Sequence, residues 1–73
     1  MMKNTYPNLE AEMARQGLRR KDLAEVLDVR TATIYDKLNG KFPFTLNEAM
    51  RIRDSLFPNL TIDYLFSSET LTA

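Results

Sequence analysis

The sequence contains no cysteine and no histidine. These absences exclude disulfides, zinc sites built on thiolate or imidazole ligands, and serine–histidine or cysteine–histidine nucleophiles. Only two glycines occur, and neither belongs to a phosphate-binding loop. We therefore expect no catalytic residue, no metal site and no cofactor, and we expect that the protein is not an enzyme.

Long apolar segments are also missing. The longest unbroken apolar run is Tyr64-Leu65-Phe66, whereas a helix that crosses a bilayer needs roughly 20 such residues. The opening residues MMKNTYP lack the apolar stretch of a signal peptide. We expect a cytoplasmic, nucleoid-associated protein with no membrane partner.

Glycine and proline are rare, with two and three residues in 73, and no stretch alternates between polar and apolar residues. These features favour helices over strands, and a chain of this length forms one small domain. We predict an all-α protein, folded as a compact bundle of about five short helices. The single domain spans residues 1–73, with an ordered core at about residues 7–66.

Capping signals divide the chain into helical segments. Pro7 suits a first helical turn and Gly17 suits a helix stop. Thr45 and Glu48 have the spacing of a capping box, in which each side chain accepts a hydrogen bond from the other residue's backbone N–H. Thr61 is expected to cap the last helix. The predicted helical segments are residues 7–17, 19–29, 31–39, 45–57 and 61–66.

Apolar residues at helical spacing give each segment one face for burial. The fourth segment provides the longest such face, and Pro58 closes it. The expected core residues are Leu9, Met13, Leu23, Ala24, Leu27, Ile34, Leu38, Leu46, Ala49, Ile52, Leu56, Ile62, Leu65 and Phe66.

The net charge is zero, but the charges are unevenly distributed. Between Arg15 and Arg53 there are nine basic and five acidic residues, a net charge of +4, and the rest of the chain has −4. If the fold keeps the middle segment together, one face is basic, and a basic face rather than the total charge meets phosphate. The alternative interpretation is an ordinary solvated surface.

Two short segments joined by a tight turn form the most informative unit, KDLAEVLDVRTATIYDKLNG. The stretches DLAEVLDV, RTATIYDKLNGK, FTLNEAMRIRDSLFP and TIDYLF resemble the lambda-repressor-like, Cro/XRE-type helix-turn-helix regulators, especially small phage and prophage members. The resemblance extends from about Asn8 to Phe66. It implies a bundle of five helices in which the third enters the DNA major groove and the second lies across the backbone.

By this resemblance, the residues that read bases are Thr31, Ala32 and Asp36. Helical geometry independently points Ala32 and Asp36 away from the buried Ile34 and Leu38. Thr31 can hydrogen-bond to a base edge, Ala32 can contact a thymine methyl group, and Asp36 can only accept a hydrogen bond, which suits the amino group of cytosine. An aspartate here acts by excluding wrong bases as much as by attraction.

Contacts to the DNA backbone are then expected to supply the affinity. The sequence departs from the family pattern in having Arg19 where an N-capping serine or threonine is common, and Arg30 where a small hydroxyl residue is common. The candidates for backbone contacts are Arg20, Lys21, Arg30, Thr33, Lys37, Asn39, Gly40 and Lys41.

Several of these residues also have structural interpretations. Thr31 and Thr33 are compatible with an ordinary helix start, and Lys37 with a local ion pair. Tyr35 is expected to pack over the junction of the second and third helices rather than to touch DNA.

Two functions follow. The first is a sequence-specific transcriptional regulator, a phage-type repressor that binds double-stranded DNA as a homodimer at a palindromic operator. The second is a protein-binding module of the same fold, an antagonist or antitoxin-like partner that has lost DNA binding, which the zero net charge and Asp36 favour. Candidates for the dimer surface, with the last helix ranked first, are Tyr6, Phe42, Phe57, Leu65 and Leu71.

Overall fold

The computed structural model describes residues 5–67, which form five helices and no strand. This confirms the predicted all-α class. No helix in the described range is long and apolar enough to cross a membrane. The helices are α1 (Pro7–Gln16), α2 (Arg20–Leu27), α3 (Thr31–Leu38), α4 (Leu46–Leu56) and α5 (Ile62–Leu65).

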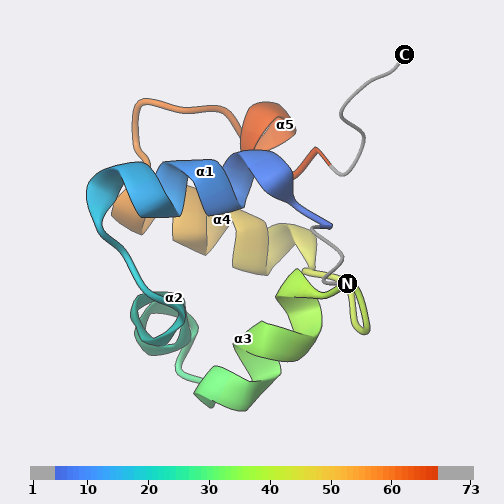
Figure 1. Cartoon of the computed structure of the whole chain (residues 1–73). Coiled ribbons are helices and arrows are strands. Elements are labelled where there is room, and N and C mark those ends of the chain that lie inside the picture. The colour runs from blue at the N-terminus through green and yellow to red at the C-terminus, as the bar shows by residue number, and fades with distance from the viewer. Residues whose placement is uncertain (1–4, 68–73) are drawn as a thin grey trace.

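Two groups of helices are joined through α4. The first pair, α2 and α3, packs together, and α2 also packs against α4; α5 packs against α1 and α4. Figure 1 shows α2 and α3 at one end of the molecule and α1 and α5 at the other. The connection between α2 and α3 is three residues long, so α3 follows α2 through a tight turn.

Side-chain caps start the later helices as the sequence predicts. The Thr45 hydroxyl accepts a hydrogen bond from the Glu48 N–H at 3.1 Å, and the Glu48 carboxylate accepts one from the Thr45 N–H at 3.0 Å. The Thr61 hydroxyl accepts from the N–H of Tyr64 at 3.1 Å. At α2 only half of such a box exists. The Asp22 carboxylate accepts a hydrogen bond from the Arg19 N–H at 2.7 Å, but the Arg19 side chain contains only donors and cannot accept one from the Asp22 N–H.

Left-handed residues end the first two helices. Gly17 has φ +69°, and the Leu18 N–H donates to the Met13 carbonyl at 2.8 Å. Asp28 adopts the same conformation with φ +59°, and the next N–H reaches back to Ala24 at 3.0 Å. A non-glycine residue in this region is strained by roughly 1–2 kcal/mol, although aspartate is one of the few that visit it. The tight turn before α3 therefore depends on a left-handed Asp28.

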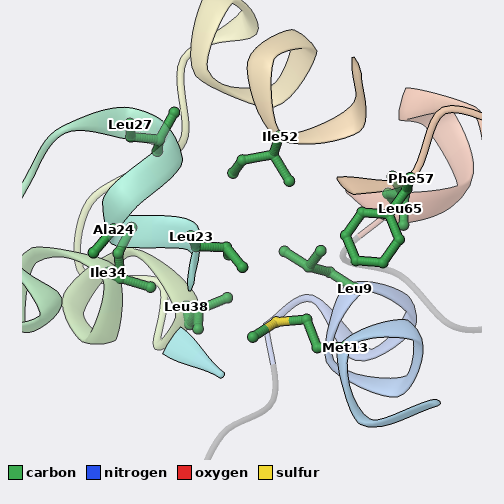
Figure 2. Packing of buried hydrophobic residues seen from close by; sticks show 10 residues of the cluster. All are labelled: Leu9, Met13, Leu23, Ala24, Leu27, Ile34, Leu38, Ile52, Phe57 and Leu65. Atoms are coloured by element: carbon green, nitrogen blue, oxygen red, sulfur yellow. The ribbon is translucent and has the colours of Figure 1, made fainter. Parts of the chain in front are cut away.

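One hydrophobic core joins all five helices. Figure 2 shows side chains from α1 to α4 pointing toward a common interior, with Phe57 and Leu65 beside them. The buried cluster comprises Leu9, Met13, Leu23, Ala24, Leu27, Ile34, Leu38, Ile52, Phe57 and Leu65.

The expectation for Leu46 is wrong, because 69% of its surface is exposed. Ala49 and Ile52 set the inward direction of α4. Leu46 is six residues before Ile52, and at 3.6 residues per turn the two side chains point about 120° apart. Leu56 is half-buried and packs against the core.

Three aromatic rings close the side of the molecule where the described chain begins and ends. Tyr6, Phe44 and Phe66 form mutual edge-to-face pairs with centroids 5.3–5.9 Å apart. Of the residues suggested for a dimer surface, Phe57 and Leu65 are buried instead, and Leu71 lies outside the described residues. The last helix was ranked first as a dimer surface, but its Leu65 side chain is part of the core and is not available for a dimer contact.

A buried carboxylate fastens α5 to α1. Glu12 is 7% exposed and accepts hydrogen bonds from the Tyr64 hydroxyl and from Arg15, both at 2.8 Å. The hydrogen bond to Glu12 raises the pKa of the Tyr64 phenol above its ordinary value, because that bond requires the protonated phenol. Asn8 adds a bond to the Tyr64 carbonyl at 2.8 Å.

Candidate nucleic-acid interface

The outward face of α3 presents the residues that were predicted to read bases. Ala32 is exposed and Asp36 is half-buried on the side opposite Ile34 and Leu38, which are 0% and 1% exposed, and Thr31 is exposed as the first residue of the helix. No side chain caps the start of α3, so the Thr31 and Ala32 N–H groups have no hydrogen-bond partner among the described residues. The Asp36 carboxylate forms no hydrogen bond or ion pair within residues 5–67.

Cationic side chains gather near the starts of α2 and α3. Lys21 and Arg30 are exposed, and Arg20 is half-buried. None of the three makes a hydrogen bond or ion pair through its side chain among the described residues. Instead, the Arg20 guanidinium lies over the Tyr35 ring, with Cζ 4.5 Å from the centroid.

An open groove of about 480 Å³ lies beside this cationic group. Apolar side chains from α1 and the α1–α2 turn meet the starts of α2 and α3 there. Three of the lining residues are cationic and one is acidic, so the groove favours anionic groups over cationic ones. The lining residues are Glu10, Met13, Ala14, Leu18, Arg19, Arg20, Lys21, Thr31 and Tyr35.

At the other end of α3, Lys37 is turned inward. Its ammonium group lies 3.1 Å from the Glu48 carboxylate and donates to the Pro43 carbonyl at 3.0 Å. The same nitrogen lies 5.7 Å from the centroid of the Phe44 ring. Only 12% of the Lys37 side chain is exposed. This arrangement matches the local ion pair considered for Lys37, and it ties α3 to the start of α4.

The carboxylate partner of Lys37 has a perturbed pKa. Partial burial by itself would raise the pKa of Glu48, but the hydrogen bond from the Thr45 N–H and the charge and hydrogen bond of Lys37 outweigh burial. The pKa therefore lies below its ordinary value of 4.5, because these partners favour the charged form.

Of the remaining predicted backbone contacts, Thr33 lies in the first turn of α3 and the others lie in the loop after the helix. Thr33 is half-buried, whereas Asn39, Gly40 and Lys41 are exposed. Gly40 has φ +85°, and a Cβ placed on it would lie 2.7 Å from the Thr5 hydroxyl. The Lys41 N–H donates to the Asp36 carbonyl at 2.9 Å, and its ammonium group lies 5.8 Å from the Phe42 ring centroid.

Two features of this region were not predicted from sequence. The Arg20–Tyr35 stack joins residues that are 15 positions apart. The groove forms only where residues of α1, α2 and α3 meet. The only signal in the sequence was the expectation that Tyr35 packs over the α2–α3 junction, which agrees with the stack.

Among residues 5–67 no three acidic side chains come together in a way that could hold a metal ion. The chain matches no family model, no curated protein and no solved structure.

Proposed function

We propose that the protein is a sequence-specific DNA-binding regulator of the lambda-repressor-like type, in which α2 and α3 act as a helix-turn-helix. The observation that supports this most directly is the distribution of unpartnered cations. Outside residues 19–41, the described cations are Arg15, Arg51 and Arg53. Each of them donates a hydrogen bond to an oxygen atom of the protein. Among residues 5–67, the cations without a polar partner are Arg19, Arg20, Lys21, Arg30 and Lys41.

This distribution suits phosphate binding because a cation that has no internal partner keeps its full charge for an external anion. In the proposal, α3 enters the major groove with Thr31, Ala32 and Asp36 at base edges. Arg20, Lys21 and Arg30 contact the backbone on the α2 side. The exposed Asn39, Gly40 and Lys41 contact it beyond the end of α3.

Lys37 has a different role in this proposal. Because its ammonium group is held by Glu48 and Pro43, it fixes the loop that presents Gly40 and Lys41 rather than meeting a phosphate itself. Thr33, half-buried on α3, lies next to the proposed contacts of the first turn.

The regulator is proposed to act as a homodimer on an inverted repeat. One 73-residue domain makes few phosphate contacts and covers one half-site, whereas two copies double both. Half-sites are then expected about one helical turn apart, roughly 34 Å.

The test is retention of random and source-genome DNA fragments at low and moderate salt, with sequencing of the retained DNA. We expect enrichment of a short inverted repeat that weakens as salt rises. Arg20→Leu should weaken binding to all DNA sequences by a similar factor. Asp36→Ala should relax the base preference at one position of the operator. Retention that does not change with salt, or no retention at all, would contradict the proposal.

One observation favours the second function, a protein-binding module. Phe42, Leu46 and Met50, all near or within the first half of α4, have 50%, 69% and 41% of their surface exposed. Large exposed apolar side chains favour contact with protein. This function would be supported instead if the wild-type chain retains no DNA at low salt but forms a stable one-to-one complex with a protein partner, and if Leu46→Ser abolishes that complex.

A further inference from the structure

The Tyr35 ring on α3 lies against the Arg20 guanidinium at the start of α2. The guanidinium carbon lies 4.5 Å from the ring centroid. We propose that Tyr35 is a positioning residue for DNA binding: it holds Arg20 in the conformation that meets a phosphate. This proposal rests on the proposed function.

Stacking suits this task because of the shape of the guanidinium group. A ring occupies one face of the plane, whereas the N–H donors of arginine lie in the plane and point outward at its edge. The stacked Arg20 therefore keeps its two terminal Nη groups for a phosphate, while its Nε is buried. A salt bridge to a carboxylate would have used that same edge.

The lack of hydrogen bonds from Arg20 is consistent with the Tyr35 ring determining the conformation of its side chain. Its Nε is buried yet has no hydrogen-bond partner, so no acceptor within residues 5–67 directs the side chain. The guanidinium makes no hydrogen bond or ion pair among these residues, and the Tyr35 ring lies against its face. Without it, this long side chain would sample many rotamers and would lose that freedom on each binding event.

Tyr35 is not needed to hold α2 and α3 together. It is 45% exposed, whereas Leu23 and Ile34, which lie in the interior from the same two helices, are fully buried. Removing the exposed ring should therefore leave the fold in place and change mainly the behaviour of Arg20. This separation makes the role testable.

The experiment is a double-mutant cycle on DNA binding at fixed salt with Tyr35→Leu, Arg20→Leu and the double variant. Tyr35→Phe is the conservative control, because it keeps the ring and removes only the hydroxyl. A stacked cation at an exposed site is worth about two- to fivefold in an equilibrium constant. We expect Tyr35→Leu to weaken specific and random DNA alike by that factor, and Tyr35→Phe to bind as the wild type does.

In the Arg20→Leu background, Tyr35→Leu should have no further effect, because there is no guanidinium left to position. The Arg20 side-chain proton resonances provide a readout without DNA: the ring should shift them upfield in the wild type and in Tyr35→Phe, but not in Tyr35→Leu. Thermal unfolding of each variant checks that the fold persists.

The outcomes separate the two proposals. No DNA retention by the wild-type chain at low salt would overturn the proposed function and, with it, this role of Tyr35. If the wild type binds DNA but the effects of the two substitutions add, or if Tyr35→Phe is as weak as Tyr35→Leu, only the positioning role is overturned.

Discussion

At the start of α3 the polar side chains form no hydrogen bond or ion pair with any other residue in the range 5–67, whereas at its end Lys37 is held by Glu48, by Pro43 and by the face of Phe44. The same short helix thus has a start whose cations are free to bind and an end that is fastened to the next helix. A charge on a helix is evidence for binding only after its internal partners have been counted.

Removing a side chain that supports both ends should have the largest effect. Ile34 is fully buried on the inner face of α3, and Ile34→Ala should lower the free energy of unfolding by about 2–5 kcal/mol. A domain of this size has roughly 4–11 kcal/mol in total, so much of the chain should unfold at moderate temperature. Urea unfolding followed by circular dichroism measures this. A decrease in the free energy of unfolding no larger than that of a surface substitution would contradict the packing described for α3.

The next effect concerns the fastened end alone. Gly40→Ala places a Cβ at φ +85° and 2.7 Å from the Thr5 hydroxyl, so we expect a loss of more than about 1 kcal/mol in unfolding free energy. Gly17→Ala is the matched control, because that glycine has φ +69° and nothing within 4 Å of its Cβ position. Equal losses for the two variants would mean that the Thr5 contact has no energetic weight.

A matched pair of cation substitutions compares the two ends directly. Lys37→Met should lower stability by about 1 kcal/mol, because Glu48 loses a largely buried partner. Arg30→Met should leave stability unchanged and, under the proposed function, should reduce the salt dependence of DNA binding by about one phosphate contact. The comparison would be reversed if Arg30→Met destabilised the fold and Lys37→Met did not.

The smallest effect is a pH dependence at the fastened end. Since the folded-state pKa of Glu48 lies below its ordinary value of 4.5, this carboxylate adds stability above pH 4.5. That contribution is lost as the pH falls through the lowered pKa. Unfolding free energies measured between pH 3 and 6 should therefore decline more steeply at the acidic end for the wild type than for Glu48→Gln.

Local signals predicted the helices well. Gly17, the Thr45–Glu48 box and Thr61 mark boundaries that depend only on neighbouring residues, and the buried face of α3 follows from its spacing. The prediction for Leu46 failed because it rested on the apolar character of the residue and did not take account of the angle of about 120° that separates it from Ile52 on α4.

The site was predicted less completely than the fold. The exposure of Ala32 follows from the buried Ile34 and Leu38, so helical geometry was sufficient there, whereas Thr31 was a candidate only through the family resemblance. The partners of Lys37 come from α4 and the loop before it, and the ring over Arg20 comes from α3. Such pairings depend on crossing angles that a single sequence does not specify.

The aromatic group of Tyr6, Phe44 and Phe66 has a consequence for the order of folding events. Its contacts join positions near 6, 44 and 66, so they close much longer loops than the contact between α2 and α3. Loops of that length close at a greater entropic cost, which places these contacts late on the folding route. Substituting Phe66 by leucine should therefore accelerate unfolding while the refolding rate stays almost constant. These aromatic contacts are then among the last to form on folding and among the first to be lost on unfolding.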